Sequence, residues 1–134
     1  MHTFFADTWY FIAQLDRRDS HHRNAVRLRE RYRPSEVVTH DGVLTELLAY
    51  FAARGKAVRT EVVGFVREVV VRAEVVPVTR SLFIAGLDLY ADRPDKGYSL
   101  TDCMSMVVMR QRGITDVFTN DHHFRQEGFT VVDQ

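Results

Sequence analysis

The sequence contains a single cysteine, Cys103, among 134 residues, so no disulfide can form within one chain. The N-terminus lacks the basic segment, long apolar run and small-residue cleavage site that a secretory signal requires. No apolar stretch approaches the roughly 18 residues that a membrane-spanning helix needs. We therefore expect a cytoplasmic protein that does not enter the membrane, in which Cys103 is a small core residue.

An excess of charge is also missing, because 18 basic residues balance 18 acidic residues. This balance is not typical of generally cationic nucleic-acid-binding proteins or of proteins that bind membrane surfaces. Charge is nevertheless uneven along the chain, since residues 16–33 carry seven arginines against three acids. Arg23, Arg27 and Arg31 recur every four residues and would form a stripe on one face of a helix. The stripe is either a solvated helix face or a surface for RNA phosphates or an acidic partner.

The chain has no Gly/Ser-rich linker, low-complexity tract or internal repeat that would divide it. A glycine-rich phosphate-binding loop of the Walker or dinucleotide type is also absent, which argues against nucleotide-cofactor enzymes of those types. The length lies near the most common domain size, and 46% hydrophobic with 27% charged residues matches an ordinary globular protein. We expect one domain that spans residues 1–134.

Short β-type runs alternate with longer helical patterns along the chain. This alternation predicts an α/β fold with a mostly parallel sheet of about five strands, covered by six or seven helices. The strands are expected at residues 3–7, 36–40, 74–78, 116–119 and 129–132. The helices are expected at residues 8–15, 20–33, 41–55, 56–72, 79–90 and 120–126, with another around residues 100–108.

Two of these helices can be phased from their apolar residues. The first buried stripe is formed by Leu100, Cys103, Met104, Val107 and Val108, and the second by Leu44, Leu47, Leu48 and Phe51. Asp102 falls outside the first stripe, and Glu46 falls outside the second. We therefore expect both acids to be held by well-anchored helices without entering the core.

Four acids occupy comparable places in this arrangement. Asp7 closes the first strand, Asp121 follows the fourth strand, and Glu46 and Asp102 lie in the first turns of helices. In open parallel α/β sheets, ligands bind beyond the carboxyl ends of the strands, so these acids could converge there. Each acid alone has a simpler interpretation. Asp7 and Asp121 could be helix N-caps, Asp102 could form a capping box with Ser99, and Glu46 could be a solvated helix residue.

The four acids together favour a metal site. Two carboxylates about 4 Å apart repel by roughly 4 kcal/mol at an effective dielectric constant near 20. Either some of the acids are protonated or a divalent cation neutralises them, and Mg²⁺ and Mn²⁺ prefer oxygen ligands of this kind. The metal is the more economical explanation, since four independent caps have no reason to lie along one edge of one sheet.

Four segments resemble the acidic motifs of PIN-domain ribonucleases, in the same order and with the same spacing: "FADT", "LTEL", "DKGYSLTDCMSMVV" and "VFTNDHHF". The resemblance spans nearly the whole chain and is closest to VapC-type toxins of toxin–antitoxin pairs. It implies a Rossmann-like α/β/α sandwich and Mg²⁺- or Mn²⁺-dependent hydrolysis of RNA phosphodiester bonds. It also implies a cognate antitoxin as partner and a homodimer.

Carried over by motif, the resemblance makes Asp7, Glu46, Asp102 and Asp121 the catalytic and metal-site acids. Asp7 and Asp102 are expected as direct ligands, with Glu46 and Asp121 acting through water or a second ion. Small hydroxyl residues of the same motifs are expected to support metal-bound water, and these are Thr8, Ser99 and Thr119. Lys96 either reaches a phosphate of the RNA or is simply solvated.

Other features have competing interpretations. Histidines 21, 22, 122 and 123 invite a zinc site, but neighbouring helix residues do not share a face and no zinc-type Cys/His spacing is present. His123 either touches RNA or has a structural role. The aromatic cluster at residues 9–11 should pack mainly in the core, with one ring exposed on a groove for an antitoxin helix.

Two other functions remain open. One is a PIN-fold module that binds RNA or protein without turnover, although all four acids are present. The other is a different metal-dependent phosphoester hydrolase, such as a phosphatase. A phosphatase would need a second acid two residues after its Asp nucleophile, where this chain has Trp9.

Overall fold

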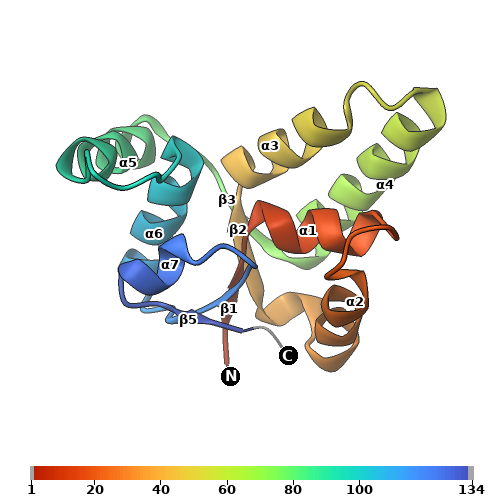
Figure 1. Ribbon diagram of the computed structural model, residues 1–134, viewed down its shortest axis with the longest axis horizontal. Helices are drawn as coiled ribbons and strands as arrows, with labels where there is room; N and C mark the ends of the chain where they lie inside the picture. The colour runs from red at the N-terminus through yellow and green to blue at the C-terminus, as the bar shows by residue number, and fades with distance from the viewer. Residues whose placement is uncertain (1, 133–134) are drawn as a thin grey trace.

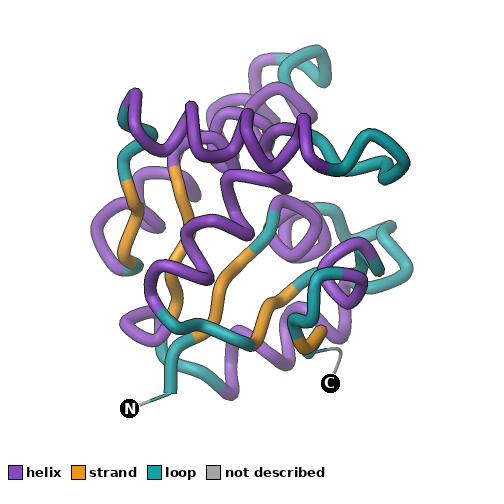
Figure 2. The backbone as a smooth tube through the Cα atoms, turned by 90° about the vertical axis from the view of Figure 1, so that its left-hand side faces the viewer, coloured by secondary structure: helices purple, strands orange, loops and turns teal. Residues whose placement is uncertain are grey.

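The computed structural model describes residues 2–132, and these form a five-stranded sheet with helices on both faces (Figure 1). The strands are β1 (Phe4–Ala6), β2 (Val37–His40), β3 (Glu74–Val76), β4 (Asp116–Phe118) and β5 (Thr130–Val131). They lie in the order β3-β2-β1-β4-β5, and every pair is parallel. Figure 2 shows the strands side by side, surrounded by helices. The predicted α/β/α fold with a mostly parallel sheet is confirmed.

The helices divide between the two faces of the sheet (Figure 1). One face carries α1 (Thr8–Leu15), α2 (His22–Arg31), α3 (Asp41–Phe51) and α4 (Lys56–Arg72). The other face carries α5 (Arg80–Asp92), α6 (Leu100–Arg112) and α7 (His123–Gln126), and a 3-10 turn, η1 (Pro34–Glu36), precedes β2. In residues 2–132 no helix has both the length and the apolar character needed to cross a bilayer.

The order of the strands reverses at β1, which has β2 on one side and β4 on the other. The backbone N–H of Asp7 donates to the carbonyl oxygen of Phe118 at 3.1 Å, so the β1–β4 pairing extends one residue beyond β1. The side chains of Phe5, Val117 and Phe118 are completely buried, because helices cover both faces of these central strands. This rigid core fixes the chain that leads directly into Asp7 and into the segment after β4.

Two expectations about helix faces were wrong. Leu44, Leu47 and Phe51 are buried as predicted, but Leu48 is 37% exposed, because it lies beside the covered face of α3 rather than on it. Asp102 was expected outside the core and is only 9% exposed. The reason is that α5 packs closely along α6: a Cβ at Gly86 would lie 2.5 Å from Met104 Cγ. With α5 on one side and the sheet on another, little of the start of α6 is open to water.

His40, at the end of β2, attaches α6 to the sheet. Its Nδ1 accepts a hydrogen bond from the backbone N–H of Gly42 at 3.0 Å, which leaves the proton on Nε2. That Nε2 lies 2.9 Å from Ser105 Oγ and 3.3 Å from the carbonyl oxygen of Thr101. A fully buried imidazole therefore holds the first turns of α6, next to Asp102, at the edge of the sheet.

Glu127, the residue directly after the short helix α7, anchors this helix to the rest of the fold. Its carboxylate accepts hydrogen bonds from Arg93 Nε at 2.9 Å, Tyr98 hydroxyl at 2.9 Å and Arg110 Nη2 at 2.8 Å. These three donors lower the pKa of Glu127 to about 2, with the hydrogen bond from Arg93 as the largest cause. The network joins the end of α5, the loop before α6 and α6 itself to the segment that carries Asp121.

Candidate metal centre

Asp7 lies directly after β1 and is 2% exposed. It occupies the N-cap position of α1, but its side chain makes no capping hydrogen bond, so the simple N-cap interpretation does not describe it. Its Oδ2 instead accepts a hydrogen bond from Thr119 Oγ1 at 2.8 Å. The same Thr119 oxygen accepts from the backbone N–H of Asp121 at 3.0 Å. One hydroxyl thus joins the ends of β1 and β4 and fixes two of the four acids.

Asp102 lies in the first turn of α6, where the predicted capping box is confirmed. Ser99 Oγ accepts from the backbone N–H of Asp102 at 3.0 Å, and Asp102 Oδ2 accepts from the backbone N–H of Ser99 at 3.0 Å. The capping role and a functional role do not exclude each other, because the box uses Oδ2 and holds the carboxylate in a fixed direction. Ser99 therefore fixes the orientation of the Asp102 carboxylate.

Asp121 lies in the turn between β4 and α7, two residues before the helix begins. Its Oδ1 accepts a hydrogen bond from the backbone N–H of His123 at 3.0 Å. The N-cap of α7 is His122, so Asp121 is not an N-cap as one interpretation expected. The helix was expected from residue 120, and it begins later because the side chains of Thr119 and Asp121 hold the intervening backbone in a turn.

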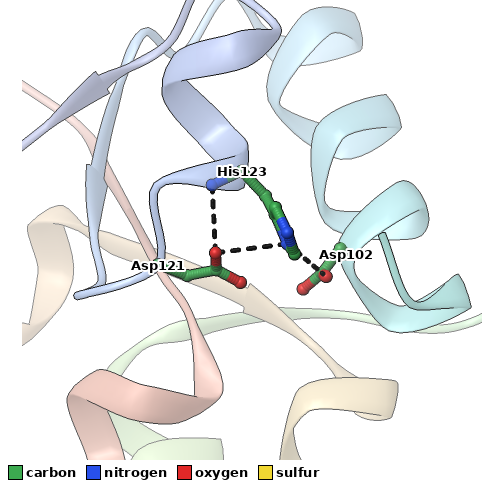
Figure 3. A group of neighbouring side chains, drawn as sticks. All are labelled: Asp102, Asp121 and His123. Atoms are coloured by element: carbon green, nitrogen blue, oxygen red, sulfur yellow. Dashed lines mark hydrogen bonds and ion pairs between the residues drawn. The ribbon is translucent and has the colours of Figure 1, made fainter. Parts of the chain in front are cut away.

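His123 completes a cluster that the sequence did not predict. Its Nδ1 lies 3.2 Å from Asp121 Oδ1 and 3.7 Å from Asp102 Oδ2, and neither contact is a hydrogen bond (Figure 3). One ligand atom from each of Asp102, Asp121 and His123 lies within 4.8 Å of the others. The signal available was the position of His123 two residues after Asp121, which alone does not say where an imidazole points.

Glu46 differs from the other three acids. It lies in the second turn of α3 rather than the first, and its side chain is exposed. It does not belong to the cluster of Asp102, Asp121 and His123. Its charge still acts on the site, because it raises the pKa of both Asp7 and Asp102 as one of the smaller causes. Glu46 therefore borders the cluster from the solvent side.

The buried acids hold their protons more strongly than free carboxyls. Burial and then the nearby charge of Asp102 raise the pKa of Asp7 to about 7, against the opposing hydrogen bond from Thr119. The pKa of Asp102 is also raised, mainly by burial and then by Asp121 and Glu46 against the hydrogen bonds of Ser99. Such shifts are typical of carboxylates that share a site without a neighbouring cation.

The supporting residues give the site further oxygen atoms. Thr8 Oγ1 is buried beside Asp7 and has no hydrogen-bond partner within residues 2–132, which is unusual for a buried hydroxyl. Lys96 Nζ lies 3.9 Å from Asp95, so the described ion pair of this lysine is not with one of the four acids. Carboxylates that repel one another and an unpaired hydroxyl are the donor set that Mg²⁺ or Mn²⁺ suits, and His123 adds one nitrogen. The residues present therefore fit a divalent cation.

Comparisons with known proteins agree with the resemblance found in the sequence motifs. The PIN domain family model matches residues 4–129. A Sarcin-Ricin loop cleaving toxin from Mycobacterium tuberculosis, VapC20, is 26% identical with a TM-score of 0.88, and the match covers 98% of this chain and 100% of that chain. Curated protein sequences give no significant match.

Two further solved structures share the fold at lower identity. A DNA-bound VapBC from Salmonella typhimurium is 22% identical with a TM-score of 0.68, covering 99% of this chain and 98% of that chain. FitAcB from Neisseria gonorrhoeae is 14% identical with a TM-score of 0.72, covering 96% of each chain. At these identities the likeness concerns the fold alone.

Proposed function

Because the chain belongs to the PIN domain family, we propose that it is a metal-dependent endoribonuclease and the toxin of a toxin–antitoxin pair. The similarity to a Sarcin-Ricin loop cleaving toxin supports RNA as the substrate class. In this proposal residues 1–134 act as one domain in the cytoplasm, where RNA and a protein antitoxin are available.

The observation that carries the proposal is the gathering of acids at the point where the strand order reverses. Asp7 and Asp121 are joined there through Thr119, and Asp102 lies with Asp121 and His123 in one cluster. Three chain segments that are far apart in sequence therefore bring mutually repelling carboxylates together. A structural role alone would not require this arrangement, because each carboxylate would be easier to bury as a neutral side chain.

The residues can be given separate roles. Asp7 and Asp102 would hold Mg²⁺ or Mn²⁺ directly, and Asp121 and Glu46 would contribute through water or a second ion. The bound ion supplies positive charge for the scissile phosphate and makes a coordinated water more acidic. Thr119 keeps Asp7 in a fixed orientation, and Ser99 does the same for Asp102. The hydroxyl of Thr8 can accept a hydrogen bond from water at the site or donate one to it. Lys96 is available for an RNA phosphate only if it leaves Asp95.

RNA cleavage tests this proposal. The purified protein should cut single-stranded RNA with Mg²⁺ or Mn²⁺ and not with EDTA, and Asp102→Asn, which preserves the shape of the capping box, should lower cutting at least about 100-fold. Asp88→Asn, at an exposed position on α5, is the matched control. RNA binding without metal-dependent cutting would identify a non-catalytic module, and hydrolysis of a phosphomonoester without RNA cutting would identify a phosphatase.

An apolar groove between α1, α2 and α4 is the proposed contact for the antitoxin. A cavity of about 220 Å³ there is lined by the apolar side chains of Phe11, Phe65 and Val69 and by Tyr10. Arg29 and Arg72 also line it, and Arg72 is paired with Glu68 at 2.7 Å, which leaves the positive charge of Arg29. Tyr10 and Phe11 are mostly buried, as predicted, and Trp9 is 40% exposed. Trp9 is not among the residues that line this groove, so the expected exposed ring does not lie on it. An antitoxin segment with apolar and acidic side chains would match this lining.

Substitutions of two neighbouring valines on α4 test whether the antitoxin binds in this groove. Val69 lines it, whereas Val70 is 54% exposed on α4 and does not. Val69→Glu should cut RNA at the wild-type rate and resist inhibition by the cognate antitoxin, and Val70→Glu should remain inhibited. Equal inhibition of both variants would place the antitoxin elsewhere.

A further inference from the structure

A second cavity, of about 230 Å³, opens beside the acid cluster. It lies between α1 and α2 on one side and the β4–α7 turn, α7 and β5 on the other. The described lining residues that matter for its chemistry are Trp9, Ala13, Asn24, Ala25, Thr119 and Asn120. The volume is below the roughly 300 Å³ at which sites for drug-sized molecules begin, so it suits a small planar group.

This cavity adjoins the proposed metal centre through Thr119. Thr119 lines the cavity and also donates to Asp7 Oδ2 at 2.8 Å. Asn120, the next residue, also lines the cavity and precedes Asp121 directly. Trp9 stands in the first turn of α1, two residues after Asp7. A molecule in the cavity would therefore lie next to a phosphate held at the acids.

The chemistry of the lining favours a nucleobase. Trp9 is 40% exposed, and the small residues Ala13 and Ala25 line the same cavity. Asn24 and Asn120 each carry a side-chain amide, which combines a donor and an acceptor as the edge of a base does. No carboxylate is among the cavity residues that the structure describes, and Arg125 adds positive charge, so an anionic chain is not repelled.

The outer face of α2 adds to this picture. Arg23 and Arg27 are exposed on the same helix whose inner residues Asn24, Ala25 and Leu28 line the cavity. RNA whose base enters the cavity would therefore pass its backbone close to the arginine stripe. This second feature favours RNA over a protein side chain as the occupant.

We propose that this cavity binds one unstacked nucleobase of the RNA, next to the scissile phosphate, and so selects where the RNA is cut. The inference rests on the proposed endoribonuclease function and adds a specificity site to it. Proteins read single-stranded RNA by stacking a splayed base on an aromatic ring and bonding to its edge. Trp9 provides the stacking surface, and Asn24 and Asn120 read the edge.

Tryptophan fluorescence tests the cavity without any cleavage. Trp9 is the single tryptophan of the chain, so its emission reports directly on stacking. The four nucleoside 5′-monophosphates are titrated with Mg²⁺, and ribose 5-phosphate serves as the probe without a base. At least one nucleotide should quench Trp9 saturably and ribose 5-phosphate should not. Asn24→Ala should weaken that quenching about tenfold, and Gln111→Ala, an exposed amide at the end of α6, should leave it unchanged.

Equal effects of nucleotide and ribose 5-phosphate, or quenching that Asn24→Ala does not change, would overturn the proposal. An absence of quenching by every nucleotide would also overturn it and would leave the cavity to a side chain of a protein partner. These results do not depend on RNA cleavage, so they are separate from the test of the proposed function.

Abasic substitution then tests the link to cutting. Single-stranded RNA with one abasic nucleotide, placed in turn at each position around the cut, should show one position at which kcat/KM falls about 10- to 100-fold. In Trp9→Ala that penalty should shrink to about threefold or less, because the stacking partner is already missing. Normal cutting with no sensitive position would overturn the cavity and leave the nuclease intact. Failure of the wild type to cut any RNA would overturn the nuclease and, with it, the role of the cavity in cutting.

Discussion

The single hydroxyl of Thr119 makes hydrogen bonds to two of the four acidic residues. It donates to Asp7 Oδ2 and accepts from the backbone N–H of Asp121, and it is buried. Removal of this hydroxyl takes one hydrogen-bond partner from the buried carboxylate of Asp7 and one from the backbone N–H of Asp121. The orientation of two acids therefore depends on a residue that binds no metal itself.

Thr119→Val, which keeps the shape of the side chain, should destabilise the fold by about 1–3 kcal/mol and weaken Mn²⁺ binding. Thr119→Ser keeps the hydroxyl and should retain most of both properties. Chemical denaturation and a Mn²⁺ titration of the two variants measure this difference. Equal behaviour of valine and serine at position 119 would show that the hydroxyl does not hold the acids.

Asp7 is a second residue at which function and stability conflict. Its carboxylate is buried among other acids, so its ionised form is unfavourable in the metal-free protein. Asp7→Asn should therefore raise the free energy of unfolding in EDTA at pH 8 by about 1–2 kcal/mol and abolish RNA cutting. Denaturation curves with and without EDTA check this. A metal-free Asp7→Asn protein that is less stable than the wild type would contradict the electrostatic account.

At the scale of single residues, the sequence predicted which residues carry the acidic groups better than it predicted where their side chains point. Asp7, Asp102 and Asp121 stand where the ends of strands and the start of a helix were expected. The exposure of Glu46 was predicted from the apolar stripe of α3, but the burial of Asp102 and the entry of His123 into the cluster depend on how α6 and α7 pack against other elements. A local pattern contains no information about the neighbour that covers the other side of a helix.

Between elements, the His40 imidazole connects β2 to α6 through Thr101 and Ser105. Burial lowers the pKa of His40 to about 4, and the hydrogen bond to the carbonyl of Thr101 and the charge of Asp41 oppose this only partly. His40 is therefore neutral in the fold at pH 7. Its unfolded form takes up a proton below about pH 6.5, so the contribution of His40 to stability falls as the pH decreases from about 6.5 to 4.

Asp7 has the opposite dependence over an overlapping range. Its folded pKa of about 7 lies above the ordinary value of 3.8, so the fold gains stability from Asp7 as the pH falls through that interval. The two residues should largely compensate in the wild type. Metal-free Asp7→Asn should therefore lose stability between pH 6.5 and 4.5 more steeply than the wild type, by roughly 2 kcal/mol.

Unfolding free energies at several pH values test this difference, and NMR titration of His40 should show a neutral ring down to about pH 4. Parallel curves for the two proteins would contradict the opposing roles. The Glu127 network does not affect the comparison, because both proteins contain it and its lowered pKa reduces stability mainly below about pH 4.5, where the unfolded glutamate is more than half protonated.

The elements themselves were mostly predictable. The expected bounds of α1 and α4 agree with the structure, because an apolar period and clear flanking residues mark both. The start of α7 was wrong by three residues and the end of α3 by four, since side-chain hydrogen bonds in a turn and fraying at a helix end leave no periodic signal. The cavity beside the acids was not predictable, because four separate segments form it.

The whole molecule exposes an apolar stripe on the outer face of α5. Ile84, Leu87 and Tyr90, three residues apart, are 45%, 42% and 50% exposed. Their spacing places them near one side of the helix, away from its buried contact with α6. We propose that this stripe contacts a second copy of the chain in the expected homodimer.

Leu87→Lys should shift the protein from dimer to monomer in size-exclusion chromatography with light scattering. Val71→Lys is the matched control, because Val71 is 81% exposed on α4, on the opposite face of the sheet. A dimer that survives Leu87→Lys, or a wild type that is monomeric at all concentrations tested, would contradict this assignment.

Direct titration of Mn²⁺ into the purified protein, followed by electron paramagnetic resonance of the free ion, tests the central claim that the gathered acids hold a divalent cation. The account predicts saturable binding by the wild type and by Asp88→Asn, with binding at least about tenfold weaker in Asp7→Asn and in Asp102→Asn. Equal Mn²⁺ binding by all four proteins, or no binding by the wild type, would contradict it.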